Sequence, residues 1–344
     1  MFETKMNNNS ETTGTCSVPV QKATGLEGAG SVRIYSCVAL LSAEAPATLP
    51  ATQGHHAHAA FLDLVRGVDP DLAAWLHDSR GRKPFTVSPL RGLPAGREGQ
   101  VHVPAGWTCW LRFTFLAQPV FDTFLAALLK GETPPRIRLG TGSFLVTEVL
   151  CTPGSHPWAG WTTAEALGAI TLGAGRPGQP GLSGTVEVQN VATAGAAETS
   201  KKAGGLTAFT FELASPTAWS LGGNGSRRVE VLPTPALFFG SLLSSWNAWF
   251  GDRFGHISPE VRDYFSEAVV VSRLDLKTRM YRYHDHLQVG VVGRVSYRLL
   301  DVPGTAEARV LNTLADLAFY TGVGYQTTMG MGQVRRLPDE SLPL

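Results

Sequence analysis

The first half of the chain alternates between two hydrophobic periods. Apolar side chains recur at helical spacing in residues 120–129 and alternate with polar ones in residues 108–116, which predicts a helix and a strand. The full order is strand 32–41, helix 55–66, short helix 70–77, strands 85–90 and 108–116, helix 120–129 and strand 136–149. This β-α-β-β-α-β order is that of a ferredoxin-like unit.

The same order returns in the second half of the chain. The expected elements are strand 208–213, helix 236–250, strands 268–283 and 288–300, helix 306–320 and strand 331–337. We therefore expect an α+β protein made of two tandem ferredoxin-like (RRM-like) domains, at 31–150 and 206–344.

Two further segments have a different composition. Residues 1–30 are polar and rich in Asn, Thr and Gly, which predicts a disordered tail. The connector 151–205 includes residues 173–205, where eight glycines and five charges predict a flexible insertion. Trp158 and Trp161, in the ordered first part of the connector, are either core side chains or platforms for stacked bases.

Composition narrows the class of protein. The chain has 43% hydrophobic and 17% charged residues, and no apolar run approaches the length of a membrane span. Lys5 is not followed by the apolar segment of a secretory signal, and the four cysteines form no Cys-x-x-Cys pair. We expect a cytoplasmic protein with reduced thiols and no membrane partner.

The net charge of +1 hides two basic segments, 77–112 and 273–298. The second contains Arg273, Arg279 and Arg282, and His284 lies at the turn that follows. Such segments predict either a face that binds RNA or an ordinary solvated strand surface and turn.

Residues 321–336 form a Gly-rich segment between the last expected helix and strand. Side-chain-free residues let a backbone approach phosphate oxygens, and Arg335 adds positive charge at the end of the segment. The alternative is a set of tight turns. The Gly-Lys-Ser/Thr ending of a nucleotide-triphosphate loop is missing. The candidate RNA-binding residues here are Gly322, Gly324, Thr327, Thr328, Gly330, Gly332 and Arg335.

A helix, a Gly-rich loop and a strand at the end of a chain resemble the RAMP-type CRISPR proteins. Within that group, residues 320–334 look most like the terminal loop of CRISPR-associated protein six, an endoribonuclease. The resemblance continues at Ser245–Phe250, Val289–Gly293, Leu76–Asp78 and Lys83–Leu90, and so spans about residues 54–337.

This resemblance implies a metal-independent endoribonuclease without cofactors. It would cut CRISPR repeat RNA (pre-crRNA) into guide RNAs with 2′,3′-cyclic phosphate and 5′-hydroxyl ends, and CRISPR effector subunits would be further partners. The main alternative is a non-catalytic RAMP-type subunit that holds guide RNA. A tandem RRM protein is a more distant alternative, because the aromatic RNP motifs are missing.

Cleavage of RNA without metal needs a base, an acid and positive charge near the phosphate. Histidine titrates near neutrality and serves either proton transfer, and the dispersed acidic residues show no two-metal pattern. The resemblance places the acid/base histidine at His77 and the phosphate-stabilising lysine at Lys83, whereas His77 could also be a helix-end residue that interacts with the dipole.

Three histidines on helix 55–66 are further candidates. Some members of the family carry a tyrosine on this helix, but the matching stretch Ala59–Leu62 has no hydroxyl. His58 is the candidate that shares the proton transfers with His77, and His56 is a weaker one. A polar helix start and an adventitious metal site are the alternatives; we expect no metal.

Overall fold

The computed structural model describes residues 31–97, 99–131, 134–168, 207–222, 228–283, 286–300 and 305–338. The expected tail 1–30, the Gly-rich insertion 173–205 and His284 lie outside these ranges. No helix in the described part of the chain is long and apolar enough to cross a membrane.

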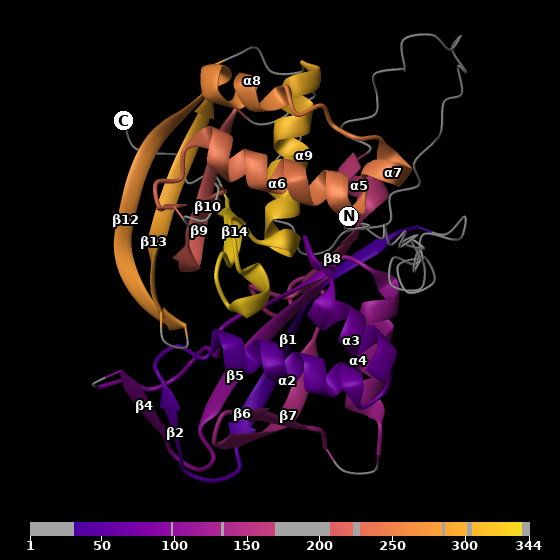
Figure 1. The fold of residues 1–344 in the computed structure, drawn as a ribbon, viewed down its shortest axis with the longest axis vertical. Coiled ribbons are helices and arrows are strands. Elements are labelled where there is room, and N and C mark those ends of the chain that lie inside the picture. The colour runs from indigo at the N-terminus through magenta and orange to yellow at the C-terminus, as the bar shows by residue number, and fades with distance from the viewer. Residues whose placement is uncertain are drawn as a thin grey trace, which may run out of the picture.

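The first half forms an antiparallel sheet covered by helices on one face (Figure 1). Its strands are β1 (Arg33–Ala43), β3 (Phe85–Val87), β5 (Thr108–Phe115), β6 (Arg136–Leu139) and β7 (Gly142–Leu150), in the order β3-β5-β1-β7-β6. Helices α2 (Gly54–Arg66), α3 (Pro70–Asp78) and α4 (Gln118–Leu129) contribute to the core below them. The order β3-β5-β1-β7 is that of a ferredoxin-like sheet.

The second half repeats this plan. Strands β9 (Ala208–Thr217), β12 (Val269–Tyr283), β13 (His286–Leu299) and β14 (Val334–Leu337) lie in the order β12-β13-β9-β14. Helices α6 (Pro235–Trp249) and α9 (Ala306–Thr321) pack on one face, and the short 3-10 helix η1 (Thr327–Met329) precedes β14. The prediction of an α+β protein with two tandem ferredoxin-like units is confirmed.

Each unit has its own aromatic core. Phe61 of α2 packs on Phe85, Phe113 and Phe124, with ring centroids 4.3 to 6.3 Å apart. In the second unit, Phe238 and Phe239 of α6 pack on Phe211 and Tyr297 in the same manner. Burial of large aromatic side chains fixes α2 and α6 against their sheets.

The predicted bounds of three strands were wrong. Residues 136–149 form the hairpin β6–β7 and not one strand, because Gly140, with φ 58°, turns the chain. The expected strand 85–90 ends at Val87, and 331–337 begins as a strand only at Val334. Trp158 is a core side chain at 8% exposure, whereas Trp161 is 40% exposed and lies under Arg33.

Several smaller elements have no counterpart in the expectations. They are β2 (Ala47–Pro50) paired with β4 (Gln100–Val103), β8 (Gly160–Thr163) paired with β1, α5 (Ala164–Gly168), β10 (Trp219–Leu221) paired with β11 (Arg228–Glu230), α7 (Gly251–Phe254) and α8 (Val261–Ala268). They are short, so their hydrophobic periods are too brief to read.

Candidate active site

A pocket of about 330 Å³ lies where α2, α3 and η1 meet. It brings together segments from both ends of the chain, since α2 and α3 belong to the first unit and η1 to the Gly-rich segment. His58 and His77 both contribute to its wall, and their shared role in proton transfer stays a prediction. The lining residues are His55, His58, Ala59, Leu62, Asp63, Arg66, His77 and Met329.

His58 is half-buried and has a fixed orientation. Its Nδ1 lies 3.0 Å from the carbonyl oxygen of Thr328, and its ring stacks on Phe85 at 5.7 Å. A carbonyl only accepts hydrogen bonds, so Nδ1 carries the proton in the neutral ring and Nε2 keeps its lone pair. Burial lowers the pKa of His58, the Thr328 carbonyl opposes this, and the charges of Lys83 and His77 lower it further.

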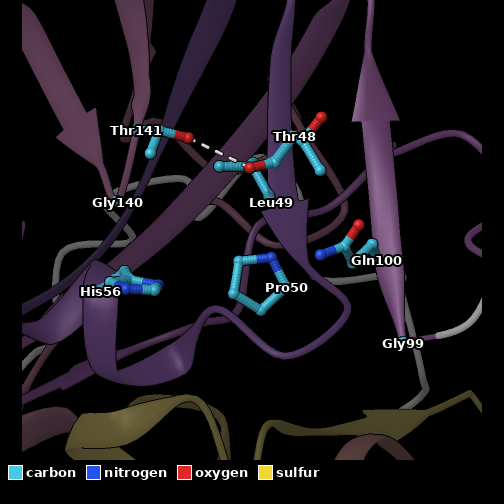
Figure 2. Close-up of a pocket in the computed structure, with 8 residues that line it drawn as sticks. All are labelled: Thr48, Leu49, Pro50, His56, Gly99, Gln100, Gly140 and Thr141. Carbon is cyan, nitrogen blue, oxygen red and sulfur yellow. Dashed lines mark hydrogen bonds between the residues drawn. The ribbon is translucent and has the colours of Figure 1, made fainter.

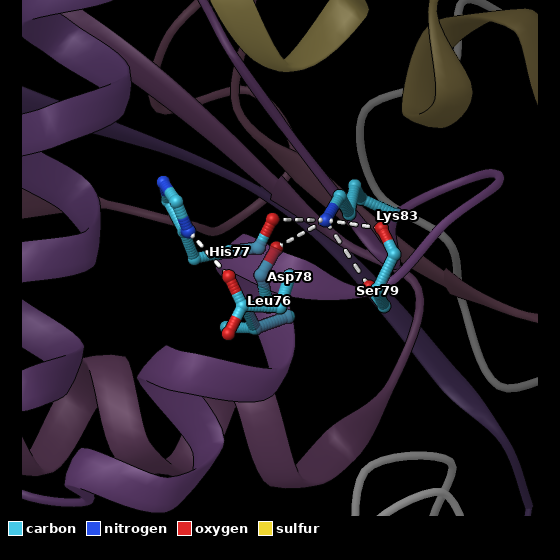
Figure 3. A network of polar contacts seen from close by, with 5 residues as sticks. All are labelled: Leu76, His77, Asp78, Ser79 and Lys83. Atoms are coloured by element: carbon cyan, nitrogen blue, oxygen red, sulfur yellow. Dashed lines mark hydrogen bonds and ion pairs between the residues drawn. The ribbon is translucent and has the colours of Figure 1, made fainter.

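His77 is exposed at the end of α3. Its Nδ1 lies 2.7 Å from Asp78 Oδ1, so this nitrogen donates to the carboxylate and Nε2 is the second position for a proton (Figure 3). Asp78 therefore orients the ring, as carboxylates do in many acid/base sites.

Lys83 follows a short loop after α3 and turns back onto the end of that helix. Its Nζ donates to the carbonyl oxygens of Leu76 at 2.5 Å, His77 at 2.9 Å and Ser79 at 2.7 Å (Figure 3). The last carbonyls of a helix have no partner within it, so the ammonium caps α3. Lys83 thus reaches the backbone of His77 and not its ring, and burial lowers the pKa of Lys83 while Asp78 opposes this.

His56 faces a different cavity. It lines a pocket of about 780 Å³ between β2, the start of β4 and the β6–β7 turn (Figure 2). Its ring lies 3.8 Å, centroid to centroid, from that of His55, which lines the first pocket. The structure therefore separates His56 from the pair formed by His58 and His77.

The Gly-rich segment packs against the chain itself. Gly330 has φ 88°, and a Cβ there would lie 2.9 Å from Gly54 Cα at the start of α2. At Gly332, with φ 68°, a Cβ would lie 2.1 Å from the oxygen of Val323. The packing of the loop therefore requires glycine at these two positions, and their contact with RNA stays a prediction. Gly322 and Gly324 also have positive φ, and Thr327 and Thr328 are half-buried on η1.

The candidate cationic residues differ in whether their side chains are paired within the protein or exposed. Arg335 is paired with Glu212, with 2.6 Å between Nε and Oε2, and its guanidinium lies over Trp158. Arg273 and Arg279 lie on β12, and both of their side chains are exposed. Arg282 also lies on β12, but its side chain is outside the described part of the chain.

Arg66, Asp63 and Met329 also line the pocket, although no motif in the sequence singled them out. His55, Leu62 and Arg66 are spaced by seven and four residues, which puts them on one face of the helix. This spacing could have identified Arg66 as a neighbour of the histidines. In the part of the chain that the structure describes, no group of three or more His, Cys, Asp or Glu residues is arranged to hold a metal ion.

Two ferredoxin-like units and a Gly-rich loop before the last strand define a RAMP-type protein. Two family models match the chain, the CRISPR Cas6 N-terminal domain over residues 34–168 and the CRISPR-associated endoribonuclease Cas6 over residues 211–334. The chain belongs to the Cas6 family, whose members are RNA-cleaving enzymes.

Solved structures agree with this assignment. A product complex of Cas6 (TTHB231) is 29% identical, with a TM-score of 0.66 over 89% of this chain and 100% of the other. Thermus thermophilus Cas6 (TTHB231) is 27% identical, with a TM-score of 0.61 over 90% and 100%. A product complex of Cas6 (TTHA0078) is 27% identical, with a TM-score of 0.59 over 89% and 100%. Comparison with curated proteins gives no significant match.

Proposed function

We propose that this protein cuts CRISPR repeat RNA at one position in each repeat, without metal, and leaves 2′,3′-cyclic phosphate and 5′-hydroxyl ends. One observation carries the proposal: His58 and His77, on separate helices, line one pocket beside the Gly-rich loop. The product complexes of two related Cas6 proteins support an RNA substrate. The released guide RNAs would pass to a CRISPR effector complex.

In this mechanism His58 is the general base. Its Nε2 lone pair takes the proton of the 2′-hydroxyl, whose oxygen then attacks the neighbouring phosphorus. Because its pKa is lowered, His58 is mainly neutral at physiological pH, which a base requires.

His77 is the general acid. As the bond from phosphorus to the 5′-oxygen breaks, protonated His77 gives its proton to that oxygen, and the cyclic phosphate and 5′-hydroxyl are formed. Positive charge at Lys83 stabilises the crowded phosphorane. Arg66 also lines the pocket, but it is ion-paired with Asp63, which reduces its contribution. Lys83 acts from the end of α3, where it also maintains the position of His77.

The test is single-turnover cleavage of labelled repeat RNA in EDTA. The native protein is expected to cut, and a substrate with a 2′-deoxy nucleotide just upstream of the cut is expected to bind and resist cleavage. His58→Ala and His77→Ala should each lose on the order of 10²-fold in rate with RNA affinity retained. His256→Ala is the matched control, because His256 is also exposed and bonded to an aspartate, Asp252, outside the pocket.

Other results would overturn parts of the proposal. Cleavage that requires added magnesium would refute the metal-independent mechanism. Loss of activity in His58→Ala alone would remove His77 from the chemistry. If RNA binds and is never cut, the protein is a guide-RNA-binding subunit.

Lys83→Ala should slow cleavage and lower the melting temperature. Its control is Lys130→Ala, because Lys130 also caps a helix end, at Gly67, and lies outside the pocket.

A further inference from the structure

Arg112 of β5 is 1% exposed, and all of its described hydrogen-bond acceptors are neutral. The guanidinium donates to Ser36 Oγ at 2.7 Å, to Gln333 Oε1 at 2.8 Å and to the carbonyl oxygens of Phe319 and Trp158. Burial lowers its pKa to about 9, so the group stays charged at neutral pH. A buried charge is costly, and an apolar side chain would fill this place at lower cost.

Two aromatic rings complete the site. The guanidinium carbon lies 4.9 Å from the ring centroid of Trp158 and 4.3 Å from that of Phe319. Cation–π contacts of this kind offset part of the cost of burial. They also fix the plane of the guanidinium, so its hydrogen bonds have defined directions.

The partners of Arg112 lie at both ends of the Gly-rich loop. Phe319 belongs to the last turn of α9, before Gly322, and Gln333 directly precedes β14, after Gly332. Gln333 is itself buried, and its backbone N–H donates to Ser215 Oγ at 2.9 Å. A side chain from the first unit thus holds the entry and the exit of a loop from the second.

The middle of that loop contacts the candidate active site. The carbonyl of Thr328 accepts from His58, and Gly330 lies against the first residue of α2. A shift of the loop ends would therefore move the acceptor that fixes the proton on His58 Nδ1.

We infer that Arg112 is a positioning residue for RNA cleavage, which holds both ends of the Gly-rich loop so that Thr328 orients His58. The inference rests on the proposed function of the His58 pocket. Arg112 contacts neither RNA nor the reacting atoms in this role. Substitution of Gln333 is the most direct way to test this role, because it removes the Arg112–Gln333 bond and leaves the buried charge of Arg112 in place.

The experiment compares three variants with the native protein. Gln333→Leu removes the acceptor for Arg112 and also the longer bonds from Nε2 to Thr86 Oγ1 and the Val87 carbonyl. Gln333→Glu loses the same Nε2 donors but retains the acceptor, so it isolates the bond to Arg112. Ser245→Ala removes a different bond between the units, from Arg82 at 2.9 Å. The measurements are the single-turnover rate at saturating repeat RNA, the Kd for RNA, and the ¹⁵N shifts of the His58 ring, which report its tautomer.

Gln333→Leu should lose on the order of 10- to 10²-fold in rate, as expected for a small displacement of catalytic groups. Its Kd should stay within about threefold, because phosphate contacts dominate RNA affinity. The Nδ1–H signature of His58 should weaken in this variant. Gln333→Glu and Ser245→Ala should keep a near-native rate and tautomer.

Two results would overturn the inference: a native rate and tautomer in Gln333→Leu, or an equal loss of rate in Ser245→Ala, which would indicate general loosening of the two units. If Gln333→Leu does not fold, Gln333→Asn, whose amide is one methylene shorter, gives the same comparison. If the native protein cuts no RNA, the proposed function fails, and the tautomer measurement still tests whether Arg112 positions the loop.

Discussion

At the scale of single residues, three histidines on one helix differ only through their surroundings. His55 and His58 line the pocket shared with His77, whereas His56 faces the separate cavity beside β2. The described contact of His58 bears on its chemical role, because a backbone carbonyl fixes its proton on Nδ1. In the proposed mechanism, the environment of the imidazole, and not its residue type, makes His58 the base.

The pH dependence of cleavage tests this role. The folded-state pKa of His58 lies below its ordinary value of about 6.5, so the neutral base persists to lower pH. The acid limb of the single-turnover rate should fall below pH 6.5, with the ¹⁵N titration of His58 in agreement. An acid limb above pH 6.5 would contradict the assignment.

The lowered pKa of His58 also makes the free energy of unfolding depend on pH. The unfolded chain binds this proton more readily, so the contribution of His58 to stability is complete above the unfolded pKa and is lost as pH falls through the folded pKa. The groups that set the shift are the Thr328 carbonyl, which opposes it, and Lys83 and His77, which add to it. Asp63 and Arg66 also line the pocket. His77→Ala removes one repulsive charge and should raise the pKa of His58.

At the scale of elements, the Gly-rich loop is a tightly packed connection that reaches from α9 to α2. It needs glycine where φ is positive and where another backbone is close, and Gly330 meets both conditions. The loop therefore acts as a structural part of the pocket as well as a candidate RNA contact.

Gly330→Ala should displace the loop from α2 and slow cleavage by about tenfold or more. Gly131→Ala is its control, because Gly131 also has a positive φ, of 101°, but a Cβ there would meet nothing within 4 Å. Both changes carry a backbone cost of about 1–2 kcal/mol. Melting temperature and single-turnover rate separate the two effects: equal rates in both variants would show that the close contact with Gly54 is irrelevant to cleavage.

At the largest scale, the β12–β13 hairpin extends along one side of the molecule (Figure 1). Strand β12 carries exposed cationic side chains. Arg273, Lys277 and Arg279 are separated by even numbers of residues on β12 and so share one face of the strand, together with Asp275. Leu276, between them, packs against the core of the second unit. We propose that RNA binds along this face, since Arg335 is already paired with Glu212.

Replacement of Arg273 and Arg279 by alanine should weaken RNA binding and lower the slope of log Kd against log salt by about 2. The rate at saturating RNA should change little, because neither residue lines the pocket. The control is the replacement of Arg136 and Arg138 by alanine, because these residues are exposed on β6 and their loss removes the same charge. An equal change of slope in both double variants would show that only net charge matters.

The order of the main strands and helices in both units could be predicted from the amino-acid sequence. The periods of 2 and 3.6 residues are local, so the main strands and helices could be read from neighbouring side chains alone. The same reading merged β6 with β7, because the turn at Gly140 interrupts the apolar pattern by only two residues. The segment from Leu76 to Leu90 also carried enough of the family pattern to single out His77 and Lys83.

Which of these residues come into contact depends on the tertiary fold and could not be predicted from the sequence. Thr328 and His58 are 270 positions apart, and their hydrogen bond depends on how the two units pack. The burial of Arg112 and the pairing of Arg335 with Glu212 likewise follow from contacts between distant segments. A local pattern predicts which face of an element is apolar, but it contains no information about the partner that covers that face. The shared pocket of His58 and His77 therefore became visible only in the folded chain.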